Sequence, residues 1–159
     1  MFKIALVSFI IVLNCLTVVT HAAEASREMK IDASPAEVWK AIGPFCSIAD
    51  WYPGIDTCTE ENIDGAIHRR LVTADGNRFL EKLLKHDDAS MSYSYTIEQG
   101  PLPVADYSAT IGVTDNGTKA HITWNGNFKP NGVSEAEAVK IISDIYDSGL
   151  KAISKQFAK

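Results

Sequence analysis

The sequence predicts an α+β domain in which an antiparallel sheet is covered on one face by a long C-terminal helix. Several segments between residues 66 and 128 alternate apolar and polar side chains, which is typical of antiparallel strands with one dry face. Apolar residues at helical spacing then occupy the last part of the chain. The length of 159 residues suits one such domain.

The N-terminus has the composition of a secretory signal peptide over residues 1–22. A basic start is followed by an apolar run over 4–19, and small residues then offer cleavage after Ala22 or as late as Ala25. The alternative is an uncleaved membrane anchor, but the run is shorter than the ~20 residues that span a bilayer comfortably. We therefore predict one domain over 26–159, periplasmic or secreted and without stable membrane insertion.

Charge and motifs exclude several classes of partner. The chain carries 20 acidic against 15 basic residues, and these charges are interleaved rather than clustered. Such a chain is a poor partner for nucleic acid or anionic lipid surfaces. The sequence also has no nucleophile motif, no phosphate-binding glycine loop and no zinc-type ligand pairing. It therefore predicts no cofactor, no metal and no catalytic nucleophile.

The predicted first strand, over 27–31, leads into two short helices. Ser34 and Glu37 form a capping box, and the proline between them suits the first helical position. A Gly-Pro pair at 43–44 ends this helix, and a second short turn occupies 45–51. Two such helices bury little alone, so they need a concave partner in the rest of the chain.

Removal of the signal peptide leaves two cysteines, Cys46 and Cys58. Export places them in an oxidising compartment, where an even number of cysteines favours a disulfide. The pair would staple the second short helix to the start of the following strand. The alternative is two buried free thiols.

The remaining strands follow from alternation and from turn residues. The Asp-Gly pair at 75–76 and the Asn-Gly pair at 116–117 predict hairpin turns. With the first strand, the count is about seven. The remaining predicted strands span 56–62, 66–73, 79–85, 91–98, 107–113 and 120–128.

The long helix begins at a second predicted capping box, formed by Ser134 and Glu137. Its apolar spacing continues almost to the end of the chain, for ~25 residues, which is long for a small domain. Gly149 and two alanines make its inner face small. These small residues leave room either for a ligand or for close packing.

Three polar residues share strand faces with apolar ones. Arg69, Glu81 and Tyr107 are each in phase with the apolar residues of a different predicted strand. A buried charge is costly unless it is paired. Either they form a structural Arg–Glu pair in a packed core, or they border a wet cavity. His68 and His121 fall on the opposite faces, where we expect them to face solvent.

A family resemblance extends this interpretation. SPAEVWKAIG after a first strand, then ADWYPGI, and later GPLPVADY resemble the START-like (SRPBCC) superfamily, in its polyketide cyclase/dehydrase and lipid-transport branch. The resemblance covers nearly the whole chain after Ala25. It implies the helix-grip fold, in which a curved antiparallel sheet grips a long C-terminal helix and encloses a cavity, with two short helices after the first strand.

The resemblance also implies site residues. In related plant hormone receptors, the counterparts of Arg69, Glu81 and Tyr107 border the pocket, whereas the lysine that binds a ligand carboxylate falls at Tyr52. Trp51 and Tyr52 would either close the mouth of the cavity or only pack at the end of the second short helix. The predicted ligand-binding residues are Arg69, Glu81, Tyr107, Trp51, Tyr52, Tyr93, Tyr95 and Trp124.

Two functions follow. The first is an exported binding module for a small hydrophobic or amphipathic ligand. The resemblance reaches exported members associated with methanol oxidation, which implies a variant that is accessory to a periplasmic redox system and has a protein partner. The alternative is a cyclase, hydratase or isomerase in which Glu81 is the base and Tyr107 or Arg69 stabilises an enolate. A dry core without ligand is the third outcome.

Overall fold

A computed structural model describes residues 22–115, 117 and 119–158. The predicted signal peptide lies outside the described residues, apart from Ala22. The strands are β1 (Ala23–Ile31), β2 (Ile55–Ile63), β3 (Ala66–Thr73), β4 (Arg78–Asp87), β5 (Ser92–Gln99), β6 (Val104–Asp115) and β7 (Ala120–Pro130). The helices are α1 (Pro35–Ile42), the 3-10 turn η1 (Phe45–Ser47), α2 (Ile48–Trp51) and α3 (Glu135–Gln156).

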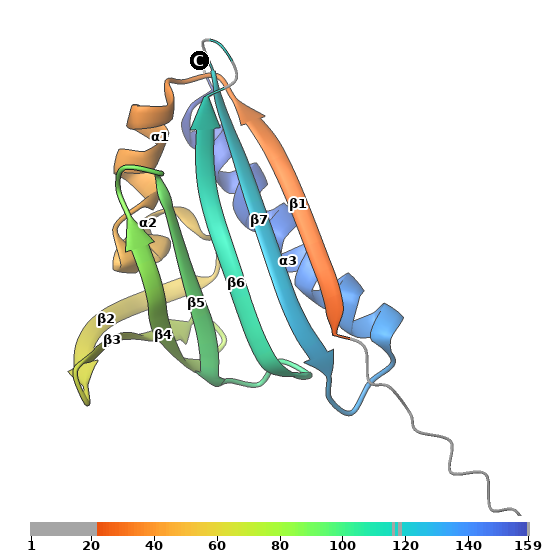
Figure 1. Ribbon diagram of the computed structural model, residues 1–159. Coiled ribbons are helices and arrows are strands. Elements are labelled where there is room, and N and C mark those ends of the chain that lie inside the picture. The colour runs from red at the N-terminus through yellow and green to blue at the C-terminus, as the bar shows by residue number, and fades with distance from the viewer. Residues whose placement is uncertain (1–21, 116, 118, 159) are drawn as a thin grey trace, which may run out of the picture.

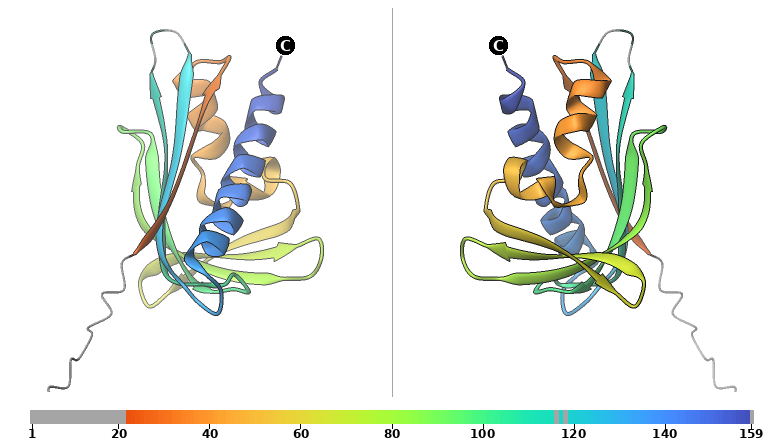
Figure 2. Two further views of the ribbon diagram at one scale, coloured as in Figure 1. Left: turned by 90° about the vertical axis from the view of Figure 1, so that its right-hand side faces the viewer. Right: turned by 90° about the vertical axis from the view of Figure 1, so that its left-hand side faces the viewer.

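The described strands form one seven-stranded sheet in the order β1-β7-β6-β5-β4-β3-β2, and every neighbouring pair is antiparallel. The sheet curves, and α3 lies along its inner face beside the two short helices (Figures 1 and 2). This is the predicted α+β helix-grip fold. No helix within the described part of the chain is long and apolar enough to cross a membrane.

Strand β1 begins earlier than predicted, at Ala23 rather than at residue 27. It pairs with β7 along its whole length, from Ala23 opposite Phe128 to Ile31 opposite Ala120. Ala23 and Ala25 are both buried in the core. The residues from Ala23 to Ser26, which the sequence suggests only as cleavage sites, are therefore part of the strand.

The predicted helix starts are present. At α1, Ser34 Oγ accepts a hydrogen bond from the Glu37 backbone N–H at 3.3 Å, and Glu37 Oε2 accepts from the Ser34 N–H at 3.0 Å. This is the complete capping box. At α3, Ser134 Oγ accepts from the Glu137 N–H at 3.3 Å, which is the serine half of the predicted second box.

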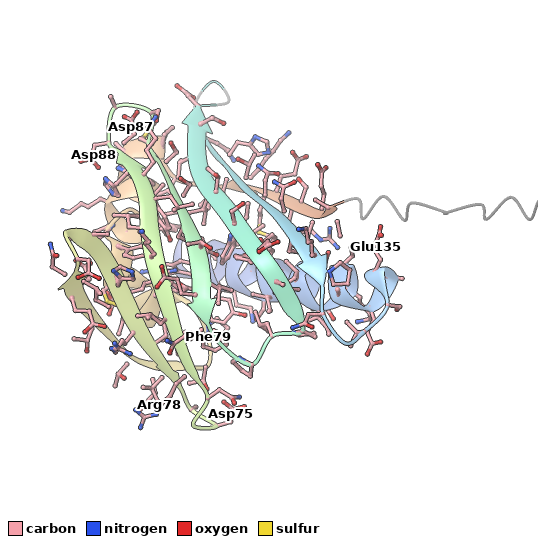
Figure 3. The ribbon with its side chains drawn as sticks, turned by 60° about the horizontal axis from the view of Figure 1, so that its bottom comes forward. Asp75, Arg78, Phe79, Asp87, Asp88 and Glu135 are labelled. Atoms are coloured by element: carbon pink, nitrogen blue, oxygen red, sulfur yellow. A yellow bond between two sulfur atoms is a disulfide. The ribbon has the colours of Figure 1, made fainter. Side chains whose placement is uncertain are left out.

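The predicted disulfide joins Cys46 in η1 to Cys58 in β2, with the two Cα atoms 5.5 Å apart. It fixes the short helices to an outer strand of the sheet. The hairpin between β3 and β4 turns at Asp75, where Gly76 has a φ of +86°. Asp75 and Asp87 mark opposite ends of β4 (Figure 3).

The sheet bends at β-bulges, which increase the local twist of antiparallel pairs. In the pairing of β4 with β5, the register shifts between Leu80 and Glu81. In the pairing of β6 with β7, it shifts between Ala105 and Ser108. Glu81 and Tyr107 therefore each lie at one of these bulges.

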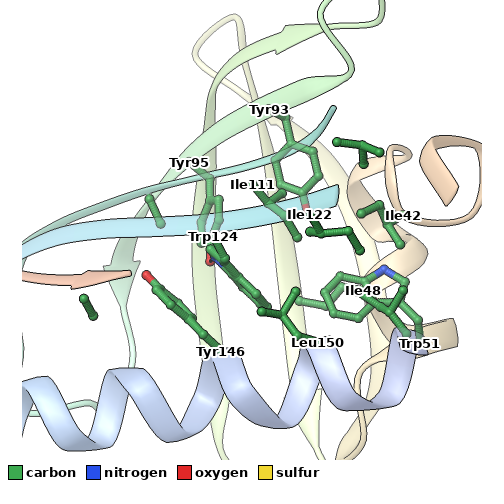
Figure 4. Packing of buried hydrophobic residues seen from close by; sticks show 14 of the residues in the cluster. Ile42, Ile48, Trp51, Tyr93, Tyr95, Ile111, Ile122, Trp124, Tyr146 and Leu150 are labelled. Atoms are coloured by element: carbon green, nitrogen blue, oxygen red, sulfur yellow. The ribbon is translucent and has the colours of Figure 1, made fainter. Parts of the chain in front are cut away.

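Gly149 of α3 provides close packing rather than space for a ligand. A Cβ at this position would lie 2.8 Å from Trp124, 3.0 Å from Tyr52 and 3.2 Å from Trp51. Trp124 also stacks on Tyr146 with ring centroids 4.5 Å apart (Figure 4). The glycine therefore allows three aromatic rings to reach the helix backbone.

The prediction that His68 faces solvent is wrong. Its exposed fraction is only 3%, and its Nε2 lies 3.3 Å from Glu98 Oε2. Its Nδ1 lies 3.0 Å from the Ala66 carbonyl oxygen. Alternation assigns His68 to the outer face correctly, but neighbouring groups cover that face here. His121 is partly exposed and lies 3.4 Å from Glu28.

Candidate functional site

A pocket of about 200 Å³ lies between the sheet, α2 and α3. It is partly open to solvent rather than fully enclosed. The rim consists of its partly exposed members, which are Tyr52, Ile55, Phe79, Ile97, Leu102 and Ile145. Its buried members are Ile48, Leu71, Glu81, Tyr95, Tyr107, Trp124 and Ile142.

At the wall of the pocket, Glu81 forms a buried ion pair with Arg69, which lies behind it. They face each other in the register of β3 and β4, and Arg69 Nε donates to Glu81 Oε2 at 2.6 Å. Arg69 is 0% exposed and Glu81 is 5% exposed. A charge-assisted bond of this kind compensates part of the cost of burying both ions.

The aromatic cover of Arg69 comes from η1 and β5. Its Nη1 donates to the Phe45 carbonyl oxygen, and its guanidinium carbon lies 4.1 Å from the centre of the Phe45 ring. Burial alone would lower the pKa of Arg69, but the charge of Glu81, with Tyr93 and Tyr95, raises it above the usual arginine value. Arg69 therefore stays protonated and holds the carboxylate from behind.

Three tyrosine hydroxyls meet beside this pair. Tyr107 OH lies 2.7 Å from Tyr146 OH and 3.3 Å from Tyr95 OH. Trp124 Nε1 donates to Tyr95 OH at 3.2 Å. Burial is the main cause that raises the pKa of Tyr95, Tyr107 and Tyr146 above the usual tyrosine value. These hydroxyls are therefore neutral donors over the whole physiological range of pH.

The structure brings most of the predicted site residues together. Tyr52, Glu81, Tyr95, Tyr107 and Trp124 line the pocket. The other three, Trp51, Arg69 and Tyr93, are buried outside the lining.

Each of these three has a packing role that alternation could not reveal. Trp51 packs edge-on against Trp124 with centroids 5.9 Å apart, and Tyr93 packs edge-on against Phe45 at 5.7 Å. Arg69 reaches the pocket only through Glu81. The hypothesis that Arg69, Glu81 and Tyr107 all border the cavity thus needs correction for the arginine.

Sequence reasoning did not name the apolar members of the lining. Leu71, Phe79 and Ile97 share strand faces with predicted site residues, so alternation could have identified them. Leu102 lies in the Gly-Pro-Leu-Pro segment, which carries no periodic signal. Ile142 and Ile145 follow the apolar stripe of α3, which does not distinguish a pocket wall from a packed core.

The arrangement offers one carboxylate acceptor, neutral hydroxyl donors and an apolar wall. Among the described residues that line the pocket there is no cysteine, serine or histidine. In the part of the chain that the structure describes, no group of three or more His, Cys, Asp or Glu side chains could hold a metal ion. The groups that line the pocket can offer a bound molecule hydrogen bonds and, at Glu81, a proton acceptor.

Solved structures with this fold include close relatives in sequence. The protein XoxI from Bacillus cereus is 35% identical, with a TM-score of 0.79 over 85% of this chain and 95% of that chain. An uncharacterised protein from Bacillus thuringiensis is 34% identical, with a TM-score of 0.79 over 85% of this chain and 98% of that one.

More distant structures share the fold alone. The ZhuI aromatase/cyclase from Streptomyces sp. R1128 is 15% identical, with a TM-score of 0.68 over 86% of this chain and 93% of that one. The search of curated proteins gives no match. The family described as "Polyketide cyclase / dehydrase and lipid transport" matches residues 22–158. The chain therefore belongs to this polyketide cyclase/dehydrase and lipid-transport family.

Proposed function

We propose that this protein is an exported binding module that holds a small amphipathic molecule in the pocket between the sheet and α3. The observation that carries the proposal is the Glu81 carboxylate, which is anchored from behind by Arg69 and presented to a largely apolar cavity. Small-molecule sites are concave and mostly apolar, with a few fixed polar groups that orient the ligand. This pocket has that composition.

Three further observations support the proposal. Membership of a family described by cyclase, dehydrase and lipid-transport activities is consistent with a ligand in the cavity. The Cys46–Cys58 disulfide suits an oxidising compartment outside the cytoplasm. The N-terminal segment with signal-peptide composition supports export on sequence grounds.

Native mass spectrometry of the protein purified from the periplasm of its own host tests the proposal. We expect a fraction with extra mass that a denaturing spectrum loses. Ile145→Trp, at the rim, should remove this fraction by filling the mouth. Ile141→Trp is the matched control, because Ile141 is partly exposed on the same helix but lies outside the lining. Ligand-free protein in every wild-type preparation would contradict the proposal.

A second candidate is a cyclase, hydratase or isomerase. The observation that favours it is a carboxylate in the same pocket as the hydroxyls of Tyr95 and Tyr107. Glu81 could remove a proton next to a carbonyl while a tyrosine donates to the developing enolate oxygen. Mass spectrometry of the released ligand after incubation distinguishes the candidates, because an enzyme changes its ligand and Glu81→Gln stops the change.

The proposal also includes the accessory role in a periplasmic redox system, with a protein partner. Its support is the family resemblance to exported members associated with methanol oxidation. Native mass spectra of gently lysed periplasm would show such a partner as a second protein mass. If only the monomer with a small ligand is found, the accessory role fails and the binding module stands.

A further inference from the structure

Among the three buried tyrosine hydroxyls beside the pocket, one O–H proton has no hydrogen-bond acceptor within the described part of the protein. Tyr95, Tyr107 and Tyr146 each carry one O–H donor, and each hydroxyl oxygen can accept two bonds. The two contacts among them use two protons, and the bond from Trp124 brings its own proton. The hydrogen bonds of the described residues give the third proton no acceptor. An unused donor in a buried site is unfavourable.

Two of the three possible holders of that proton face the pocket. If Tyr146 donates to Tyr107 and Tyr107 donates to Tyr95, the proton of Tyr95 is left without an acceptor. If Tyr95 and Tyr146 both donate to Tyr107, the proton of Tyr107 is left without one. Both residues line the pocket. Only donation towards Tyr146 would leave the proton outside the lining. A ligand oxygen in the pocket can therefore settle the direction of the chain by accepting this proton.

Glu81 supplies the complementary group. One of its oxygens, Oε2, accepts from Arg69 Nε. A carboxylate has about four lone-pair positions, so Glu81, which lines the pocket, keeps acceptor capacity beyond its bond from Arg69. A ligand hydroxyl can donate to Glu81 and accept from Tyr95 or Tyr107 with the same oxygen atom. One hydroxyl thus satisfies both unused functions.

Charged groups do not suit this position. Glu81 is the only charged side chain among the lining residues that the structure describes, and Arg69 behind it is 0% exposed. A ligand carboxylate would meet Glu81 without a cation of its own. A ligand ammonium would compete with Arg69 for one carboxylate. Both would be buried without full compensation.

The volume adds a limit on size. Pockets for drug-sized molecules measure ~300–1,000 Å³, whereas this one measures about 200 Å³. We infer that the ligand is a compact, uncharged molecule whose buried end carries a hydroxyl, bound between Glu81 and the hydroxyls of Tyr95 and Tyr107. This inference rests on the proposed function and names the chemical class of its ligand.

Four probes that share one ring system test the inference by isothermal titration at neutral pH. They are β-naphthol, its methyl ether, β-naphthoate and β-naphthylmethylamine. We expect β-naphthol to bind at least about tenfold more tightly than each of the others. The ether can accept but cannot donate to Glu81, and the remaining two carry a charge.

Variants identify the group responsible. Glu81→Gln should reduce the difference in affinity between β-naphthol and β-naphthoate, because the variant side chain no longer repels the carboxylate of the probe. The double variant Arg69→Met with Glu81→Gln should reduce the same difference in affinity, and it leaves no unpaired buried arginine. It therefore replaces the single variant if Glu81→Gln alone does not fold. Glu98→Gln is the control, since Glu98 lies outside the pocket beside His68.

The outcomes separate this inference from the proposed function. Equal or tighter binding of β-naphthoate or of the ether overturns the uncharged-hydroxyl class while leaving a binding module. A preference that persists unchanged in both Glu81 variants also overturns it. If none of the four probes binds, the inference fails, even where a co-purified ligand upholds the proposed function.

Discussion

Arg69 and Glu81 face each other across β3 and β4, with 2.6 Å between Nε and Oε2, and neither has a second ionic partner in the described part of the chain. The pair therefore contributes to the stability of the fold, and it also fixes the Glu81 carboxylate that lines the pocket. Removing one partner leaves the other charge buried, which costs far more than losing a surface pair.

We expect Arg69→Met to lower the free energy of unfolding by about 3–5 kcal/mol. The double variant with Glu81→Gln should recover a substantial part, because both charges are then absent. Urea unfolding followed by circular dichroism measures both. The control is Arg70→Met, whose side chain is exposed and pairs with Glu61. A loss no larger than that of the control would refute the buried pair as a stability determinant.

The buried tyrosines predict alkaline unfolding. The pKa values of Tyr95 and Tyr107 are raised, chiefly by burial, whereas in the unfolded chain both ionise near pH ~10. Above that pH the unfolded state holds fewer protons, so the free energy of unfolding falls as pH rises. Their contribution is complete below pH ~10 and is lost above it.

Urea midpoints measured at intervals from neutral pH to strongly alkaline pH test this. Tyr107→Phe should make the alkaline decline shallower by up to about 1.4 kcal/mol per pH unit, which is the contribution of one proton. A midpoint that stays constant well above pH ~10 in the wild type is the contrary result.

The disulfide should contribute strongly to the stability of the segment between η1 and β2, whose two ends it joins. Cys46 and Cys58 are separated by 12 positions, and a loop of this size contributes about 3 kcal/mol in the chain-entropy account. We expect Cys46→Ser with Cys58→Ser to lose about that amount in urea unfolding. Thiol titration of denatured, unreduced protein should find neither cysteine free, and two titratable thiols would be incompatible with the bond.

Gly126 of β7 makes room for the Tyr146 hydroxyl. A Cβ on Gly126 would lie 2.1 Å from that oxygen. We expect Gly126→Ala to cost about 1–3 kcal/mol, as overpacking does, and Tyr146→Phe to reduce this cost in the double variant. Gly112→Ala is the matched control, because a Cβ on Gly112 would lie 3.4 Å from Ser92 Cβ, which is ordinary van der Waals contact. Additive effects of Gly126→Ala and Tyr146→Phe would argue against the clash.

If the protein is exported as proposed, cleavage should leave Ala23 at its N-terminus. Cleavage after Ala25 would remove the pairing from Ala23 opposite Phe128 to Ala25 opposite Gly126, and two buried alanines with it. A chain that begins at Ser26 should be less stable by about 1–3 kcal/mol than one that begins at Ala23. The intact mass of the periplasmic protein gives the cleavage point, and retention of residues 1–22 would contradict export as a cleaved protein.

Alternation was sufficient to place Arg69, Glu81 and Tyr107 inside the fold, because the period of two is a local property of each strand. It could not show that Arg69 stops short of the pocket. That depends on Phe45 of η1, which covers the guanidinium. Which inward side chain reaches a cavity is decided by groups far away in the sequence.

The error at His68 has a related cause. Alternation gives the face of the sheet on which a side chain lies, but it does not say what covers that face. Glu98 of β5 lies beside the His68 ring, next to the bulge of β5 against β4. A register shift between two strands leaves no trace in the sequence of a third, so this burial could be found only in the structure.

The aromatic contact at Gly149 sets a boundary on the shape of any guest. The α3 residues of the pocket, Ile142 and Ile145, both precede Gly149, where Trp124 and Tyr52 press against the helix backbone. This partition closes the interior in the direction of the C-terminus. A guest bound between the sheet and α3 could therefore not lengthen along the helix towards its C-terminus, beyond Gly149. If the protein binds a ligand as proposed, this contact limits the length of the ligand in that direction before any hydrogen bond discriminates by chemistry.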